Sequence, residues 1–226
     1  MSQRQWTAVD DYITGALVEP DEALAAALAA SDAAGLPAIA VSPTQGKLIH
    51  LLARLVNARR ILEFGTLGGY STIWLARALP PDGRLITLEY VPKHAEVARA
   101  NIVSAGLAHL VDVRVGAALD TLPQLAKEID EDQVDPFDLV FIDADKLHNA
   151  DYFAWSVRRT RPGGVIIVDN VVRDGAVVDA HSADPDVQGT RRLNEVMAAD
   201  PSVSATAIQT VGVKGYDGFA IAIVGE

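Results

Sequence analysis

The sequence has no cysteine, which excludes disulfide bonds and thiolate metal sites and is typical of a reducing compartment. Basic residues are also scarce: 19 Lys and Arg stand against 30 Asp and Glu, for a formal net charge of -11. Because such a chain repels phosphate backbones, we expect no nucleic-acid partner. No apolar run approaches the ~20 residues that span a bilayer. The N-terminal stretch MSQRQWTAVDDYITG has no basic segment followed by an apolar block. We therefore expect a cytoplasmic protein without a signal peptide or a membrane partner.

Length and composition favour a single α/β domain across residues 1–226. Half of the residues are hydrophobic, which suffices for a sizeable core. Residues 1–42 are expected to form an N-terminal helical extension, whose Ala-rich helix begins near Asp21 and ends near Gly35. A further helix is predicted from Pro43. The charged segment 127–136 is predicted to be a solvated loop.

Short, continuous apolar runs mark the predicted strands. They lie at 59–65, 83–89, 111–116, 137–143 and 163–169, with helical patterns between them. Continuous rather than alternating runs suit strands buried on both faces, as in a parallel sheet covered by helices. Two last strands are predicted at 202–210 and 217–225. Their connection is too short for a helical crossover, so they are expected to pair in antiparallel fashion. The pattern predicts a doubly wound α/β fold.

Two of the predicted strands end in carboxylate side chains. The run 137–143 ends at Asp143, and the run 163–169 ends at Asp169, which Asn170 follows. In a doubly wound sheet, ligands collect beyond the carboxyl ends of the strands, so these groups are expected to face one crevice. Oxygen donors without His or Cys suit Mg²⁺ in the first place, and Ca²⁺ or Mn²⁺ as alternatives. The competing interpretation is that the Asp-Asn pair only caps a turn.

A lysine follows the first of these carboxylates in the stretch FIDADK. Lys146 lies three residues beyond Asp143. Beside a divalent cation its charged form is disfavoured, which suits a general base, whereas the carboxylate of Asp145 acts in the opposite direction. The sequence leaves open which effect dominates, and a surface lysine is the alternative. The five histidines show no ligand spacing; His94 is expected at the surface, and His148 lies close to the candidate site.

The first two strand ends suggest a nucleoside site. The stretch LEFGTLGGYST contains Gly65 and two further glycines, which permit a tight turn and close approach of a ligand. Its spacing differs from G-x-G-x-x-G, which argues against a pyrophosphate site. Glu89 ends the second strand, where an acidic side chain binds ribose hydroxyls. The alternatives are a turn without a ligand and a solvated glutamate.

Four motifs in order, LEFGTLGGYSTIWLA, LITLE, FIDADK and VIIVDN, resemble those of the cation-dependent O-methyltransferases, the group that contains caffeoyl-CoA and catechol-type enzymes. The resemblance implies a Rossmann-like class I methyltransferase fold with a seven-stranded, mostly parallel sheet, its last strand antiparallel, and helices on both faces. It implies S-adenosylmethionine as methyl donor and a homodimer. It implies metal binding by Asp143, Asp169 and Asn170 and a catalytic base at Lys146. The implied donor contacts are Val41 (through its backbone), Glu63, Gly65, Thr66, Ser71, Glu89, Ala118, Asp143 and Asp145.

Three residues depart from the family pattern. Asn149 stands where relatives often have tyrosine, and Arg173 and Asp174 follow the DN pair where relatives often have an aromatic residue and then Arg or Asn. These positions face the methyl acceptor in the family, so we expect an acceptor other than caffeoyl-CoA. The predicted function is methyl transfer to a hydroxyl of a catechol-like or phenolic small molecule. The alternatives are a nucleotide-dependent oxidoreductase and a non-catalytic dimer that binds S-adenosylmethionine.

Overall fold

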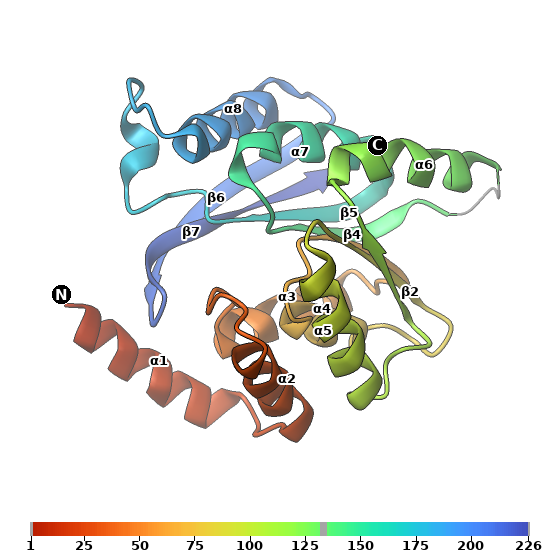
Figure 1. Cartoon of the computed structure of the whole chain (residues 1–226). Helices are drawn as coiled ribbons and strands as arrows, with labels where there is room; N and C mark the ends of the chain where they lie inside the picture. Colours follow the sequence, from red (N-terminus) through yellow and green to blue (C-terminus); the bar gives the residue numbers. More distant parts are fainter. Residues whose placement is uncertain (1, 132–134, 226) are drawn as a thin grey trace.

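One seven-stranded sheet organises the computed structural model, which describes residues 2–131 and 135–225 (Figure 1). The strand order is β3-β2-β1-β4-β5-β7-β6. The strands are β1 (Arg60–Phe64), β2 (Arg84–Glu89), β3 (Val111–Val115), β4 (Phe137–Ile142), β5 (Thr160–Asp169), β6 (Val203–Gly212) and β7 (Gly215–Val224). The first five pair in parallel, and β7 runs antiparallel to both β5 and β6. The predicted fold class and the antiparallel C-terminal pair are confirmed.

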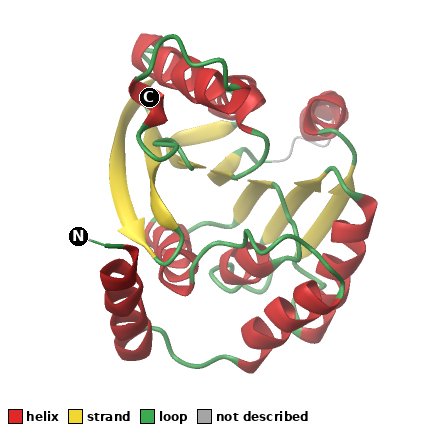
Figure 2. Ribbon diagram, turned by 60° about the vertical axis from the view of Figure 1, so that its left-hand side comes forward, coloured by secondary structure: helices red, strands yellow, loops and turns green. Residues whose placement is uncertain are grey.

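Helices cover both faces of this sheet (Figure 2). The described helices are α1 (Gln3–Leu17), α2 (Glu22–Ala33), α3 (Pro43–Leu55), α4 (Tyr70–Ala76), α5 (Pro92–Ser104), α6 (Ala118–Glu131), α7 (Asn149–Val157) and α8 (Pro185–Ala199), with short 3₁₀ turns η1 (Lys146–His148) and η2 (Ala176–Val178). The N-terminal segment is helical, as predicted. Among the described residues, no helix combines the length and the apolarity needed to cross a membrane.

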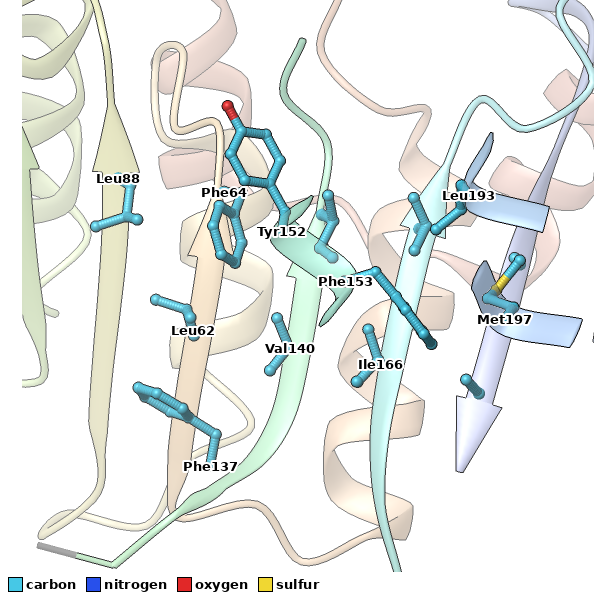
Figure 3. Packing of buried hydrophobic residues seen from close by; sticks show 14 of the residues in the cluster. Leu62, Phe64, Leu88, Phe137, Val140, Tyr152, Phe153, Ile166, Leu193 and Met197 are labelled. Atoms are coloured by element: carbon cyan, nitrogen blue, oxygen red, sulfur yellow. The ribbon is translucent and has the colours of Figure 1, made fainter. Parts of the chain in front are cut away.

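The two faces of the sheet carry two hydrophobic cores. On one face, Leu62 and Phe64 of β1 pack with side chains of α6, α7 and α8, among them Phe153 and Leu193 (Figure 3). On the other face, Ile61 of β1 packs with side chains of α2, α3, α4 and α5. Successive strand residues point to opposite faces, so a strand covered on both sides must be apolar throughout. This explains the continuous apolar runs.

The helix starts follow local rules. Asp21 caps α2 by accepting a hydrogen bond from the backbone N of Leu24 at 2.8 Å, and Ser42 caps α3 by accepting one from Gln45 at 3.2 Å. The predicted loop at 127–136 is wrong for residues 127–131, which form the last turns of α6. The buried side chains of Leu125 and Ile129 hold this amphipathic segment against the core. Residues 132–134 lie outside the described part of the chain.

Candidate functional site

A cavity of about 1270 Å³ lies at the carboxyl ends of the parallel strands. It extends across the position between β1 and β4, where the strand order reverses. Its outer wall comes from α1, which contributes Asp10 and Ile13, and from the β6–β7 hairpin. The crevice predicted from the strand ends is therefore a real cavity, closed on one side by the N-terminal helix.

The turn after β1 brings the backbone close to the next strand. Gly65 has a φ of +89°, and a Cβ atom there would lie 2.1 Å from the carbonyl oxygen of Asp143. Only glycine fits such a contact and such a dihedral angle. The turn thus depends on Gly65 and places its backbone in the cavity wall.

Glu89 holds this turn in place at the end of β2. Its Oε2 accepts hydrogen bonds from the backbone N of Thr66 at 3.1 Å and of Leu67 at 2.8 Å, and its Oε1 accepts one from Val91 at 2.9 Å. His94 Nδ1 lies 3.3 Å from the same Oε1, and the His94 side chain is only 20% exposed. His94 therefore lines the cavity. The surface position predicted for it is wrong, because the first turn of α5 leads its ring back onto Glu89.

Glu63 lies beneath the cavity wall rather than in it. Its side chain is fully buried and accepts hydrogen bonds from the hydroxyl groups of Ser71, at 2.6 Å, and Thr72. Burial raises the pKa of Glu63 to about 7. Ser71 does line the cavity, so Glu63 orients one of its polar side chains from below.

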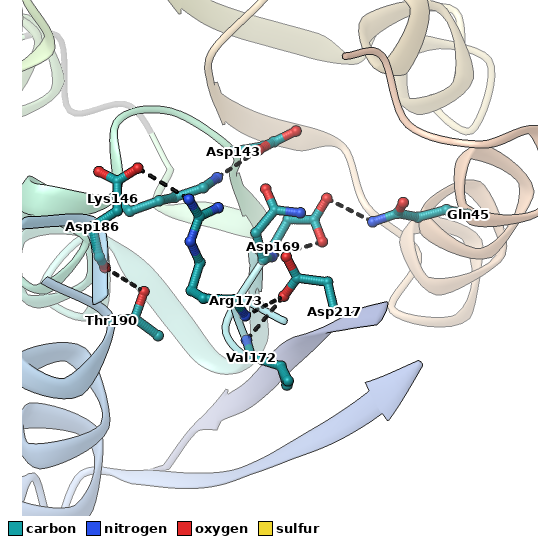
Figure 4. Close-up of polar contacts among 10 residues, drawn as sticks. Gln45, Asp143, Lys146, Asp169, Val172, Arg173, Asp186, Thr190 and Asp217 are labelled. Atoms are coloured by element: carbon teal, nitrogen blue, oxygen red, sulfur yellow. Dashed lines mark hydrogen bonds and ion pairs between the residues drawn. The ribbon is translucent and has the colours of Figure 1, made fainter. Parts of the chain in front are cut away.

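The acidic strand ends meet Lys146 and a glutamine in the same cavity (Figure 4). Lys146 is buried, and its Nζ donates a hydrogen bond to Asp143 Oδ1 at 2.7 Å. Asp169 Oδ2 accepts a hydrogen bond from Gln45 Nε2 at 2.7 Å, and its Oδ1 accepts one from the backbone N of Asn170 at 2.8 Å. The surface-lysine alternative is therefore wrong. Gln45 is a site residue that the sequence did not reveal.

This set of residues fits a divalent cation. Burial raises the pKa of Asp169 to about 7, and the negative charge of Asp143 adds to this shift. Both effects disfavour the carboxylate form of Asp169, and a bound cation would offset them. Asn170 has a φ of +58°, a conformation that is uncommon outside glycine. The described residues contain no group of three or more His, Cys, Asp and Glu that could hold a metal, so an ion here would depend on the Asn170 amide as its third protein ligand.

The carboxylate of Asp145 is bound by Tyr152 and His148. Its Oδ2 accepts a hydrogen bond from the Tyr152 hydroxyl at 2.6 Å, and its Oδ1 contacts His148 Nδ1 at 2.5 Å. Burial alone would raise the pKa of Asp145, but the hydrogen bonds from Tyr152 and His148 outweigh it and keep the pKa below its ordinary value. The structure thus pairs Lys146 with Asp143 and leaves Asp145 to Tyr152 and His148, a choice that the sequence left open.

The loop after β5 is fixed by one carboxylate. Asp217 Oδ1 accepts hydrogen bonds from the backbone N of Val172 at 2.9 Å and of Arg173 at 3.0 Å. Arg173 and Asp174 both have positive φ, at 56° and 54°. The Arg173 side chain lines the cavity, and its Nη2 lies 3.2 Å from Asp186 Oδ2 at the start of α8.

A family model described as O-methyltransferase matches residues 18–221. The chain belongs to the O-methyltransferase family. It is 54% identical over 224 residues to a catechol O-methyltransferase of Niastella koreensis, covering 99% of this chain and 100% of the relative. It is 58% identical over 216 residues to a catechol O-methyltransferase of Mycobacterium tuberculosis, covering 96% of this chain and 94% of the relative. The crystal structure of the O-methyltransferase TomG of Streptomyces achromogenes, in complex with S-adenosylmethionine, matches with a TM-score of 0.95 at 54% identity and covers 100% of both chains.

Membership of this family confirms the predicted enzyme class and favours methyl transfer over the oxidoreductase alternative. In this O-methyltransferase, most residues with an implied donor contact line one cavity: Val41, Gly65, Thr66, Ser71, Glu89, Ala118, Asp143 and Asp145. Glu63 is the exception, since it is buried under Ser71. The implied metal ligands and Lys146 line the same cavity. Their contacts with donor and metal stay predictions.

Two of the three departures from the family pattern, Asn149 and Asp174, are not part of the cavity wall of this O-methyltransferase. Asn149 is fully buried at the start of α7, and neither polar atom of its side chain has a hydrogen-bond partner among the described residues. Because Asn149 is not part of the cavity wall, the expectation that it faces the acceptor is wrong for this chain. Arg173 is the departure whose side chain lines the cavity.

Proposed function

We propose that this O-methyltransferase transfers the methyl group of S-adenosylmethionine to a hydroxyl group of a catechol, with the help of a divalent cation, Mg²⁺ in the first place. The observation that carries the proposal is the arrangement of Asp143, Lys146, Asp169 and Asn170 in the same cavity as the turn held by Glu89. The two relatives named catechol O-methyltransferase support the acceptor class, and the complex of TomG supports the donor.

The electrostatics of the cavity suit this donor. S-adenosylmethionine carries a sulfonium charge and no phosphate, and the strand ends offer carboxylates and a glycine turn without pyrophosphate spacing. Glu89 keeps the turn at Thr66 and Leu67 in position through backbone hydrogen bonds. This arrangement orients the donor before reaction, and orientation of two reactants supplies a large part of the rate enhancement in transfer reactions.

Lys146 is the residue that we assign to proton transfer. When bound by Asp143, Asp169 and Asn170, a divalent cation would lower the pKa of a catechol hydroxyl, which is ~10 when free. The neutral amine form of Lys146, held in the cavity at Asp143, accepts the hydroxyl proton at Nζ and becomes an ammonium, which the carboxylate of Asp143 stabilises. The acceptor oxygen then forms a bond to the methyl carbon as the carbon–sulfur bond breaks, and S-adenosylhomocysteine leaves.

We also propose a homodimer. The edge strand β6 is exposed over most of its length and carries Ile208 and Val211 on its surface. Helix α1, which contacts the hairpin of this strand, exposes Val9 and Tyr12. Exposed apolar side chains along an unpaired edge are typical of a surface that another chain covers. Light scattering coupled to size-exclusion chromatography tests this, and a monomer at assay concentrations would contradict it.

A transfer assay tests the main proposal. The protein is incubated with methyl-labelled S-adenosylmethionine and a panel of catechols, after chelation and after return of Mg²⁺, Mn²⁺ or Ca²⁺. We expect transfer that disappears on chelation and returns with a cation. Transfer that survives thorough chelation would exclude the metal-assisted mechanism. Binding of S-adenosylmethionine without transfer to any acceptor would favour the non-catalytic alternative, and preferential binding of NAD(H) would favour the oxidoreductase.

A further inference from the structure

Arg173 places a guanidinium group in the wall of the reaction cavity. The side chain is 28% exposed and lines the same cavity as Lys146 and Asp169. Its backbone is fixed by Asp217, and Figure 4 shows the guanidinium turned toward Asp186. A left-handed backbone is unfavourable for a non-glycine residue and persists only where the surroundings impose it. The arginine is therefore held in this place rather than free on the surface.

Most of the hydrogen-bonding capacity of this arginine is unused. A guanidinium has five N–H donors arranged to bind planar anions. Within the described part of the chain, Nη2 binds Asp186, and no hydrogen bond joins Nε or Nη1 to another residue. The other cationic side chains in the cavity wall are engaged: Lys146 binds Asp143, and Lys214 Nζ donates to the carbonyl oxygen of Ala38 at 2.9 Å.

We propose that Arg173 binds a carboxylate carried by the methyl acceptor, so that carboxylated catechols, the dihydroxybenzoate class, are preferred over neutral ones. This inference rests on the proposed catechol methylation. Carboxylates match the planar fork of arginine, and hydrogen bonds between charged partners are stronger than neutral ones. A small monoanion fits this site, because the cavity wall also contains Asp186 and Asp217, which repel a larger polyanion.

Asp186 is the competitor for the same guanidinium. Its side chain is 41% exposed, and Arg173 is the partner of its carboxylate within the described residues. The structural roles of Asp186 use its backbone, which donates to Asp184 and accepts from Thr190. Asp186→Asn therefore removes the competing charge without removing those contacts. Removing Arg173 and removing the charge of Asp186 should therefore change the preference for carboxylated acceptors in opposite directions. A general loss of stability cannot produce such opposite changes.

Two acceptors of equal size measure the effect. They are 3,4-dihydroxybenzoate and its uncharged amide, 3,4-dihydroxybenzamide, and the quantity is the ratio of their kcat/KM values. Arg173→Met should lower this ratio about ten- to 100-fold, the loss expected for one charge-assisted contact. Asp186→Asn should raise it several-fold. Arg158→Met, which changes an exposed arginine outside the cavity, should leave the ratio unchanged. The affinity for dihydroxybenzoate, measured by calorimetry in the presence of S-adenosylhomocysteine, should fall in Arg173→Met, rise in Asp186→Asn and stay unchanged in Arg158→Met.

The outcomes separate this inference from the proposed function. If the protein methylates both acceptors and neither Arg173→Met nor Asp186→Asn changes the ratio, the inference is wrong and the proposed function stands. If no catechol is methylated under any metal condition, both are wrong. If Arg173→Met does not fold, as judged by its thermal transition, the response to Asp186→Asn decides alone, and an unchanged or lowered ratio overturns the inference.

Discussion

The α-carbon of Gly189 in α8 faces the backbone carbonyl of Lys146: a Cβ atom at residue 189 would lie 2.2 Å from that oxygen. It would also lie 2.7 Å from the Cα of Leu147. Glycine in a helix interior costs roughly 0.5–1 kcal/mol relative to alanine, so its presence here needs a reason. The reason is the close packing of α8 on η1, the turn that begins with Lys146 and sets the position of its amine.

Gly189→Ala should displace Lys146, the proposed catalytic base. The added methyl group must push the η1 backbone away, and a misplacement of about 1 Å can cost 10²-fold in rate. We expect kcat to fall about ten- to 100-fold while the dissociation constant of S-adenosylmethionine stays within threefold. Steady-state kinetics and calorimetry measure the two. Gly15→Ala is the matched control, since nothing lies within 4 Å of that helical position. An unchanged kcat in Gly189→Ala would show that α8 does not position the base.

Lys146→Ala should lower turnover more than it lowers donor affinity. Loss of a general base typically costs ~10² to 10⁴ in rate. The proposed donor site depends instead on the turn held by Glu89. Rates with catechol and calorimetry with S-adenosylmethionine provide the comparison, and Lys93→Ala, an exposed lysine outside the cavity, is the control. Equal losses in both quantities would make Lys146 a binding residue.

Asp169→Ala should abolish the dependence of activity on added cation. Asp169 is buried, and its neighbours leave its negative charge poorly compensated, so its removal deletes one of the two carboxylates of the proposed metal site. We expect turnover to fall by at least about 10²-fold and calorimetric Mg²⁺ binding to disappear, with donor binding largely kept. Asp11→Ala, on the exposed side of α1, is the control. Unchanged rates in Asp169→Ala would show that the ligand assignment is wrong.

Glu63→Gln should change how stability depends on pH. Burial raises the pKa of Glu63 to about 7 in the folded protein from its ordinary value of 4.5, so the folded state binds this proton more tightly than the unfolded state does. Wild-type stability therefore falls relative to the variant as pH rises from about 4.5 to 7, by about 3 kcal/mol in all. Urea unfolding of both proteins at pH 5, 6, 7 and 8 measures the difference, with Glu195→Gln as an exposed control. A difference independent of pH would contradict the assignment.

The sequence was sufficient for features that depend on neighbouring residues. An apolar run that ends in a carboxylate predicts the end of a buried strand, and two such runs on parallel strands predict that Asp143 and Asp169 face one cavity. Asp21 and Ser42 mark the first residues of their helices in the sequence, because an N-cap side chain binds a backbone N–H only three residues further along. The positions of the strands along the chain followed from the same local patterns.

Features that depend on contacts between residues far apart in the sequence could not be predicted from the sequence. Gln45 binds Asp169, which lies 124 residues further along the chain. The sequence of its helix shows only that Gln45 is a polar residue of an amphipathic helix, which does not identify this partner. The sequence did not reveal that the hydroxyl groups of Ser71 and Thr72 donate hydrogen bonds to Glu63 and hold it under the cavity wall. Charge alone made 127–131 resemble a loop, because the pattern of Leu125 and Ile129 indicates a helix only once the core beneath them is known.

Helix α1 has no buried residue and is joined to the β6–β7 hairpin at its tip, where Gln3 binds the carbonyl oxygen of Gly212 at 2.9 Å and Asp10 accepts the backbone N of Val213 at 2.7 Å. The helix and the hairpin border the cavity, whereas the carboxylates lie at the ends of β4 and β5 and the lysine lies in η1, which follows β4. Mutations in α1 can accordingly change the shape of the cavity wall that α1 forms, and so alter which acceptors fit, without moving the proposed reaction site at the strand ends. Laboratory evolution of altered acceptor preference has a natural starting point in that helix.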